Sequence, residues 1–338
     1  MHRRTLLKSI GGASAVGLFG VNGVLAQEDF PTESLTWMIP WSEGGGTDQY
    51  ARQLAPPMEE ALGQSIEIDN REGAGSMVGS AWLAEQEPDG YTFGTVNTPG
   101  WEFTWRAQEV DEFHVEDFEP ISQAGVFGYT LIGHDELEIE DYGDLRDRYA
   151  DGDISGFGYQ GVGSDSHFIT LLLREEYGLE YDTAVPYDGG GPTSEAVMSG
   201  EVAAGFATNT SAVPAVESGL ANPIVNLMDI DLTETFPDID RIDEYGESLA
   251  WVTEFWQTQV APAGTPEEAR QAISESVEAA VNDEGAQEWA EETGNILEYS
   301  DMDETAESLE GVVEELEEQA DEALGGFDEF QRIVDEEG

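Results

Sequence analysis

Short apolar segments alternate with amphipathic segments along most of this chain, and that alternation restricts the fold more than any other feature. The apolar segments are rich in β-branched and aromatic residues, and the amphipathic ones carry apolar residues at helical spacing. Strands are predicted at residues 35–41, 65–69, 91–96, 128–132, 183–186, 202–207, 223–227 and 251–261, and helices at 50–62, 77–84, 165–177 and 193–198. Strands that alternate with helices form a parallel sheet with crossover helices, so the predicted fold class is α/β.

The last third of the chain is predicted to be helical. Apolar residues recur every three or four positions in residues 267–281 and again in 304–324, which gives each helix an apolar stripe and an acidic opposite face. We expect both stripes to pack on the core. Residues 328–338 are strongly acidic, and we expect this final stretch to be frayed.

Residues 1–26 have the pattern of an export signal and are not expected to be part of the fold. Arg3, Arg4 and Lys8 precede a weakly apolar, glycine-rich run that ends in Val-Leu-Ala. The paired arginines resemble a twin-arginine signal, which an export machinery recognises. A short transmembrane anchor is the alternative, but the run has fewer than the ~20 apolar residues that a membrane span needs.

Acidic residues outnumber basic ones by 73 to 12, for a net charge of −61. This charge excludes a protein that binds nucleic acid through its phosphates, and anionic membranes would repel the chain. Lys8 is the only lysine, and acids occur throughout the sequence. The composition resembles that of proteins from extreme halophiles, in which salt screens the repulsion; an ordinary acidic protein is the alternative. Acidic residues are therefore weak evidence for catalysis here.

Three glycine-rich segments each stand between a predicted strand and a predicted helix: residues 42–48, 156–167 and 186–192. Glycine lets the backbone turn tightly, and the start of a helix offers free N–H groups at the positive end of its dipole. Such junctions bind anions, although each is also compatible with a plain turn. Because ligands of open α/β sheets lie outside the carboxyl ends of the strands, we expect a crevice lined by these helix N-termini.

Motifs of enzymes and metal sites are scarce. The Gly-x-Ser-x-Gly motif of serine hydrolases does not occur. His114, His134 and His167 lack the spacing of a zinc site, and for His167 a structural role competes with a catalytic one. With no cysteine, the chain has no thiol nucleophile, no disulfide and no lipid-modified cysteine. We predict neither an enzyme nor a cofactor or metal site.

Seven short segments recur in a fixed order in one protein family. They are Ile-Pro-Trp with Gly-Gly-Gly-Thr-Asp at 39–48, Ala-Leu-Gly-Gln at 61–64, Asp-Asn-Arg-Glu-Gly-Ala-Gly at 69–75, Pro-Asp-Gly-Tyr-Thr at 88–92, Gly-x-Gly-Ser-x-x-His at 161–167, Val-Pro-Tyr-x-Gly at 185–189 and Ala-Pro-Ala-Gly-Thr-Pro at 261–266. Through them the chain resembles the extracytoplasmic solute receptors of tripartite tricarboxylate transporters, the Bug or TctC family. Glu43, Glu72 and Asp188 depart from the family pattern, and Glu43 and Asp188 flank the inferred site.

The resemblance implies a periplasmic-binding-protein fold of type II, in which two α/β lobes close on a ligand. Lobe 1 would comprise residues 27–124 and 253–338, and lobe 2 residues 125–252. A small carboxylate would lie between the first loop and the Gly163-Ser164 loop, held mainly by backbone N–H groups. The implied ligand-binding residues are Trp41, Ser42, Gly45, Gly46, Thr47, Asp48, Thr98, Gly163, Ser164, His167, Tyr187 and Gly189.

The implied function is that of a receptor outside the cytoplasm. It would capture a carboxylate-bearing solute and deliver it to the membrane components of a tripartite tricarboxylate transporter. We expect an exported monomer without a cofactor. Two alternatives stay open: a binding module of a solute-sensing signalling system, and a secreted hydrolase, for which the sequence offers no nucleophile–base set.

Overall fold

The computed structural model describes residues 30–337, so the predicted export signal at residues 1–26 lies outside the described residues. The strands form one path of hydrogen-bonded neighbours in the order β2-β1-β3-β10-β4-β7-β5-β6, with β8 beside β4 and β9 beside β8. They are β1 (Leu35–Ile39), β2 (Ile66–Asn70), β3 (Thr92–Thr98), β4 (Phe118–His134), β5 (Phe157–Tyr159), β6 (Ala184–Pro186), β7 (Ala204–Thr208), β8 (Ala221–Asn226), β9 (Asp240–Arg241) and β10 (Glu254–Pro262).

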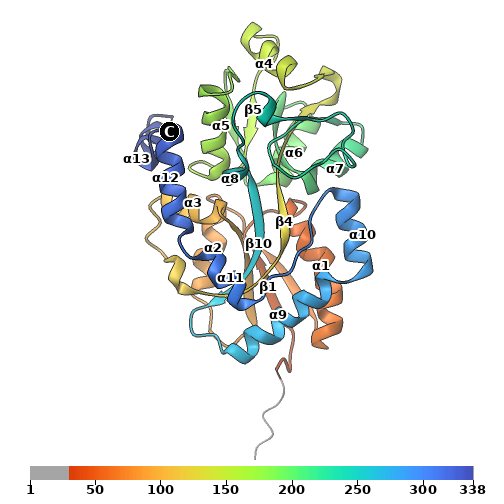
Figure 1. Cartoon of the computed structure of the whole chain (residues 1–338), viewed down its shortest axis with the longest axis vertical. Coiled ribbons are helices and arrows are strands. Elements are labelled where there is room, and N and C mark those ends of the chain that lie inside the picture. The colour runs from red at the N-terminus through yellow and green to blue at the C-terminus, as the bar shows by residue number, and fades with distance from the viewer. Residues whose placement is uncertain (1–29, 338) are drawn as a thin grey trace, which may run out of the picture.

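The long strand β4 takes part in both halves of the sheet (Figure 1). Its residues 118–128 pair with β10, and its residues 129–134 pair with β7 and β8. We call β1–β3, β10 and the first part of β4 the lower half, and β5–β9 with the second part of β4 the upper half. In the lower half β1 is parallel to β2 and β3, whereas β10 is antiparallel to β3.

Helices flank the strands in both halves. Several begin shortly after the carboxyl end of a strand: α1 after β1, α3 after β3, α5 after β5, α6 after β6 and α7 after β7. The helices are α1 (Gly46–Leu62), α2 (Met77–Ala84), α3 (Gly100–Ala107), α4 (Tyr142–Asp151), α5 (Asp165–Glu175), α6 (Gly190–Met198), α7 (Asn209–Glu217), α8 (Ala250–Thr253), α9 (Glu267–Val281), α10 (Glu284–Thr293), α11 (Met302–Leu309), α12 (Val312–Leu324) and α13 (Phe327–Glu337).

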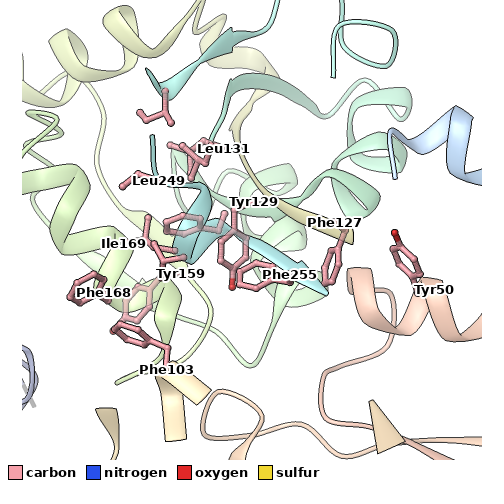
Figure 2. Packing of buried hydrophobic residues seen from close by; sticks show 14 of the residues in the cluster. Tyr50, Phe103, Phe127, Tyr129, Leu131, Tyr159, Phe168, Ile169, Leu249 and Phe255 are labelled. Atoms are coloured by element: carbon pink, nitrogen blue, oxygen red, sulfur yellow. The ribbon is translucent and has the colours of Figure 1, made fainter. Parts of the chain in front are cut away.

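A row of aromatic side chains connects the two halves through the core (Figure 2). The ring centroids of Tyr50 and Phe127 are 5.5 Å apart, those of Phe127 and Phe255 5.7 Å, and those of Phe255 and Tyr129 4.8 Å. All four side chains are buried. Aromatic pairs at such distances stabilise a core beyond the area that they bury. Because Phe127 and Tyr129 flank the point where β4 changes partners, the core continues from one half to the other.

The predicted elements are mostly confirmed, but two predictions for the C-terminal region are wrong. Residues 304–324 do not form one helix, because Gly311, with φ of +84°, separates α11 from α12. The final stretch is not frayed: it forms α13, and its Phe330 is completely buried. The strand predicted at residues 251–261 is shorter than expected, because residues 250–253 form α8. Helices α3, α4, α7 and α10 and strand β9 were not predicted. Within residues 30–337, no helix combines the length and the apolar character that a membrane span requires.

Candidate ligand-binding site

The loop between β1 and α1 is held in place by Asp48. Its carboxylate accepts hydrogen bonds from the N–H of Gly44 (2.9 Å), from Arg52 Nε (2.8 Å) and from Asn70 Nδ2 (3.0 Å). The helix then begins at Gly46 without a side-chain cap, because its N-cap residue is Gly45. First-turn N–H groups have no acceptor inside the helix. Those of α1 are therefore available to a ligand.

Asn97, near the end of β3, fixes two side chains of this loop. Its Oδ1 accepts hydrogen bonds from Trp41 Nε1 (2.7 Å) and from Thr47 Oγ1 (2.9 Å). Its Nδ2 donates to Gln257 Oε1 on β10 at 3.2 Å, which in turn fixes the amide. Trp41 and Thr47 thus form a rigid wall beside the start of α1.

The start of α6, in the upper half, faces the start of α1. Its N-cap residue is Gly189, with φ of +127°, and this helix also lacks a side-chain cap. A Cβ atom placed on Gly45 would lie 3.8 Å from the amide nitrogen of Gly191 and 3.9 Å from that of Gly190. Two uncapped helix N-termini, one from each half, therefore approach each other closely.

A small cavity of about 30 Å³ lies between the two halves at this point. This volume holds only about one or two water molecules, so a larger solute requires the walls to move apart. The walls combine glycine and polar residues with a group of aromatic ones. The lining residues are Trp41, Gly45, Gly46, Thr47, Ser76, Asn97, Gly100, Trp101, Phe127, Tyr129, Gln160, Asp165, Gly190, Thr208 and Phe255.

The cavity is lined by the first residues of four helices, α1, α3, α5 and α6, and by Thr208, the N-cap residue of α7. Side chains cap α5 and α7, through Ser164 and Thr208, whereas α1, α3 and α6 have no side-chain cap. Helix N-termini carry partial positive charge and attract anions. Of the residues that the structure describes, no lysine, arginine or histidine lines the cavity. An anion here would be bound by backbone dipoles and neutral donors.

Gln160 supplies such a donor. Its Nε2 is buried and has no hydrogen-bond partner among the described residues. It lies beside the start of α6, because a Cβ atom on Gly190 would be 3.4 Å from it. A buried N–H group without a partner costs free energy, so a ligand oxygen at this end of the cavity would be stabilising.

Asp165 lies at a different part of the cavity, against α3 and β10. It is 3% exposed, and a Cβ atom on Gly100 would be 2.7 Å from both its Oδ2 and Phe255 Cε1. The Tyr129 hydroxyl donates to Oδ2 over a long 3.4 Å. Loss of water around the carboxyl raises the pKa of Asp165 to about 7. The lining therefore combines donors at α1 and α6 with an acceptor, Asp165, that lies against α3 and β10.

The structure distributes the residues predicted to bind ligand over several roles. Trp41, Gly45, Gly46 and Thr47 line the cavity. The rest of the predicted set lies outside this lining. Their direct part in ligand binding stays a prediction.

The second glycine-rich junction is organised around α5. Ser164 caps the helix by accepting a hydrogen bond from the N–H of His167 (3.3 Å) and donates to the carbonyl of Gly161 (2.8 Å). The N–H of Gly163 donates to His167 Nδ1 (3.2 Å), and the buried imidazole stacks on Tyr159 with centroids 4.6 Å apart. These contacts give His167 a structural role.

The other predicted residues hold neighbouring strands and loops. Thr98 shares a hydrogen bond of 2.9 Å with Thr258, which joins β3 to β10. Tyr187 donates to Glu201 Oε1 at 2.9 Å. Ser42 is buried close to Gly189, where a Cβ atom would lie 2.9 Å from its hydroxyl, and this hydroxyl has no partner among the described residues.

Much of the lining was not predicted from the sequence. Gln160, Asp165 and Gly190 fall inside the glycine-rich segments already singled out, but no local signal distinguished them. Asn97, Phe127, Tyr129, Thr208 and Phe255 are on strands and reach the cavity through long-range pairing, and Ser76, Gly100 and Trp101 lie at the starts of α2 and α3. Among residues 30–337, no group of three His, Asp or Glu side chains is arranged to hold a metal ion.

A family model described as "Tripartite tricarboxylate transporter family receptor", TctC, matches residues 50–310. The chain belongs to this family. The loop at residues 42–48 lies just before the matched range.

Among curated relatives of this TctC receptor, the "UPF0065 protein in the TAR-I ttuE-ttuC' intergenic region" of Agrobacterium vitis is 28% identical over 280 residues, which are 82% of this chain and 80% of that protein. Protein BugT of Bordetella pertussis is 25% identical over 260 residues, 75% and 78% of the two chains.

Solved structures share the fold of this TctC receptor. MatC from Rhodopseudomonas palustris with bound malate aligns with a TM-score of 0.74 at 24% identity over 90% of this chain and all of that chain (100%). An R. palustris protein with adipate aligns with a TM-score of 0.76 at 24% identity over 87% and 98%. The periplasmic binding protein BugD aligns with a TM-score of 0.74 at 22% identity over 91% and 98%. The predicted fold class, an α/β periplasmic-binding-protein fold, is confirmed.

Proposed function

We propose that this TctC receptor captures a small carboxylate-bearing solute outside the cytoplasm and delivers it to the membrane components of a tripartite tricarboxylate transporter. The observation that carries the proposal is the approach of the uncapped N-termini of α1 and α6 beside the unpartnered Gln160 Nε2. Each such helix end favours an anion by about 0.3–2 kcal/mol. The malate and adipate complexes of proteins with the same fold support a carboxylate ligand.

The two halves act as lobes in this proposal, residues 27–124 with 253–338 and residues 125–252. The cavity takes its walls from both, with Gly46 on one side and Thr208 on the other. A Cβ atom on Gly46 would lie only 2.5 Å from Thr208 Oγ1, so the halves are closed on each other. Entry of a solute therefore requires them to separate, with β4 and β10 as the connecting strands.

The proposed site of action follows from the N-terminal sequence and the family. A twin-arginine signal at residues 1–26 would export the folded chain, as a monomer, to the outside of the cytoplasm. The net charge of −61 suits a saline medium in which surface repulsion is screened.

Replacement of Arg3 and Arg4 by lysine should keep the precursor inside the cell, as detected by immunoblot of the cell fractions. Normal export would contradict the twin-arginine assignment.

The test of the receptor proposal is a melting experiment at fixed, molar salt. The probes are malate, adipate, alanine and 4-aminobutyrate, each as the acid and as its methyl ester. A ligand at 100 times its Kd stabilises the folded state by ~2.7 kcal/mol, which raises the melting temperature by about 5 °C for a chain of this size. At least one acid should produce this rise and be recovered unchanged, and its ester should lose most of it. No rise with any acid, equal rises with acid and ester, or turnover of the acid would contradict the proposal.

Gly45→Ala identifies where the carboxylate binds. Its methyl group would fill the space between the amides of Gly45 and Gly190 with one tight contact, 3.3 Å from the carbonyl of Ser42. We expect the fold to persist and the affinity for the acid to fall at least tenfold. The matched control is Gly285→Ala, at an exposed position in the first turn of α10, which should bind as the wild type does. Equal affinity of Gly45→Ala and wild type would place the carboxylate elsewhere.

A further inference from the structure

Asp165 is a buried carboxyl that faces the cavity, and the carboxylate-binding end of the site does not use it. It is the first helical residue of α5, one position after the N-cap residue Ser164, whose side chain caps the helix. The carboxyl accepts hydrogen bonds from the Tyr129 hydroxyl (3.4 Å to Oδ2) and from the backbone N–H groups of Ser166 and of Asp165 itself, fewer than the roughly four that a carboxylate can accept. The carboxyl therefore retains capacity to accept hydrogen bonds from a ligand.

Two aromatic rings beside Asp165 can attract a cation. Phe255 and Tyr129 lie beside it, with their rings 4.8 Å apart in an edge-to-face arrangement. Aromatic faces attract an ammonium group, and a carboxylate forms its strongest hydrogen bonds with one. Of the described residues that line the cavity, none is a lysine, an arginine or a histidine that could neutralise Asp165 from the protein side.

Gly100 allows this arrangement. A Cβ atom at that position would come within 2.7 Å of both Asp165 Oδ2 and Phe255 Cε1, so any larger residue would push the carboxyl or the ring away. Because Gly100 has no side chain, the Asp165 carboxyl has room at the cavity wall beside the start of α3. The part of the lining at Gly45, Gly190 and Gln160 presents first-turn amides and the unpartnered Gln160 Nε2.

We propose that the solute carries an ammonium group as well as a carboxylate, and that Asp165 binds the ammonium group and selects such solutes over dicarboxylates. This proposal rests on the proposed function, because it assumes that the carboxylate occupies the end formed by α1 and α6. A second carboxylate at the Asp165 end would face a like charge. The opposite arrangement, in which a protonated Asp165 donates to a dicarboxylate, is the outcome that would overturn the proposal.

The test is titration calorimetry with solutes of matched length. The probes are butyrate, succinate and 4-aminobutyrate in one series, and propionate, malonate and alanine in another, so that both positions of the amino group are sampled. At about pH 8, where an ionised Asp165 is expected, the amino acid of at least one series should bind wild type at least tenfold more tightly than the dicarboxylate. Asp165→Asn should remove this preference by weakening amino-acid binding tenfold or more. The control is Asp303→Asn, at an exposed first-turn position of α11.

The pH dependence provides a second measurement. Tyr129 of β4 is the titratable group in contact with Asp165, Glu102 is a further buried carboxyl on α3, and Phe255 of β10 is uncharged. Affinity for the amino acid should fall as the pH is lowered through about 7, since burial raises the pKa of Asp165 to about 7. Affinity for the dicarboxylate should rise over the same interval. Asp165→Asn should remove both trends.

Two results would overturn the proposal. One is a dicarboxylate that binds wild type as tightly as, or more tightly than, the matched amino acid. The other is an Asp165→Asn protein with an unchanged preference. In either case a loss of carboxylate binding in Gly45→Ala would still support the receptor, so failure of the ammonium proposal is distinguishable from failure of the proposed function.

Discussion

Asp165 and Glu102 are two buried carboxyl groups whose protonation affects the stability of this fold. Loss of water raises the pKa of Asp165 to about 7 and that of Glu102 to about 8. Glu102 is 4% exposed, and its Oε2 has no hydrogen-bond partner among the described residues. The folded protein keeps both protons to a higher pH than the unfolded chain does. Both groups therefore stabilise the fold in acid, and this contribution is lost as the pH rises through 7 and 8.

Asp165→Asn should stabilise the ligand-free protein above neutral pH. Because the pKa of Asp165 rises from its ordinary value of 3.8 to about 7, its ionisation lowers the free energy of unfolding by at most ~4 kcal/mol at alkaline pH. The neutral amide avoids this cost, so the melting temperature should rise more at about pH 8 than at about pH 5. A gain that is the same at both pH values would show that Asp165 is not buried in its ionised form. Asp303→Asn serves as the exposed control.

The sequence analysis found the residues of the site that a local pattern reveals. Trp41 and Gly45–Thr47 stand in a strand–glycine–helix junction, and they line the cavity. Asn97 and Phe255 could not be found in this way, because they reach the cavity only through the pairing of β3 with β10. Asp165 was hidden for another reason: in a chain with 73 acidic residues, a single aspartate carries no signal until its burial is known.

Among the elements, the helix that differs most from expectation is α13. The ring of Phe330 lies 6.0 Å from that of Phe103 on α3 and 5.4 Å from that of Phe168 on α5. Arg106 of α3 adds an ion pair of 2.7 Å with Glu317 of α12. The C-terminal helices thus pack across both halves. The acidic sequence of α13 concealed this, since its few apolar residues lie on one face.

Phe330→Ala should destabilise the protein by about 3–5 kcal/mol, as expected for removal of a fully buried aromatic ring. Thermal or denaturant unfolding at molar salt measures the change. The control is Glu336→Ala on the exposed side of the same helix, for which the loss of a surface ion pair with Arg332 costs at most about 1 kcal/mol. A Phe330→Ala protein as stable as wild type would mean that α13 does not pack on α3 and α5.

Of the helices that begin at the cavity, α1, α5 and α6 were predicted, with ends that differ by a few residues, and α3 and α7 were not. The bounds predicted for α2 and α9 are those observed. In contrast, α7 begins with Asn209, Thr210 and Ser211, whose side chains are typical of turns, and its fold depends on packing against β4 and β8. The convergence of several helix N-termini on one cavity is likewise a property of the assembled sheet.

For the whole molecule, we expect the net charge of −61 to make folding depend on the salt concentration. Repulsion among the acidic side chains opposes the compact state, and salt shortens its range from about 30 Å at 0.01 M to about 3 Å at 1 M. We expect the melting temperature to fall steeply when molar salt is diluted to tens of millimolar. A circular dichroism spectrum and melting temperature unchanged over this range would contradict salt adaptation.

A triple variant tests the cause of this salt dependence. Glu314, Glu318 and Glu322 are exposed and follow one another at four-residue intervals along α12. Like charges at this spacing repel one another by a few tenths of a kcal/mol per pair. Replacing all three by glutamine should raise the melting temperature at low salt and leave it nearly unchanged at molar salt. An equal change at both salt concentrations would point to packing and not to charge.

The central claim is that two uncapped helix N-termini, one from each half, bind the carboxylate of the solute. A crystal structure of the protein with its tightest-binding acid tests this claim most directly. We predict carboxylate oxygens at hydrogen-bond distance, about 2.7–3.2 Å, from first-turn amides of α1 and α6 and from Gln160 Nε2. A carboxylate bound away from Gly46 and Gly190, with those amides untouched, would contradict the account.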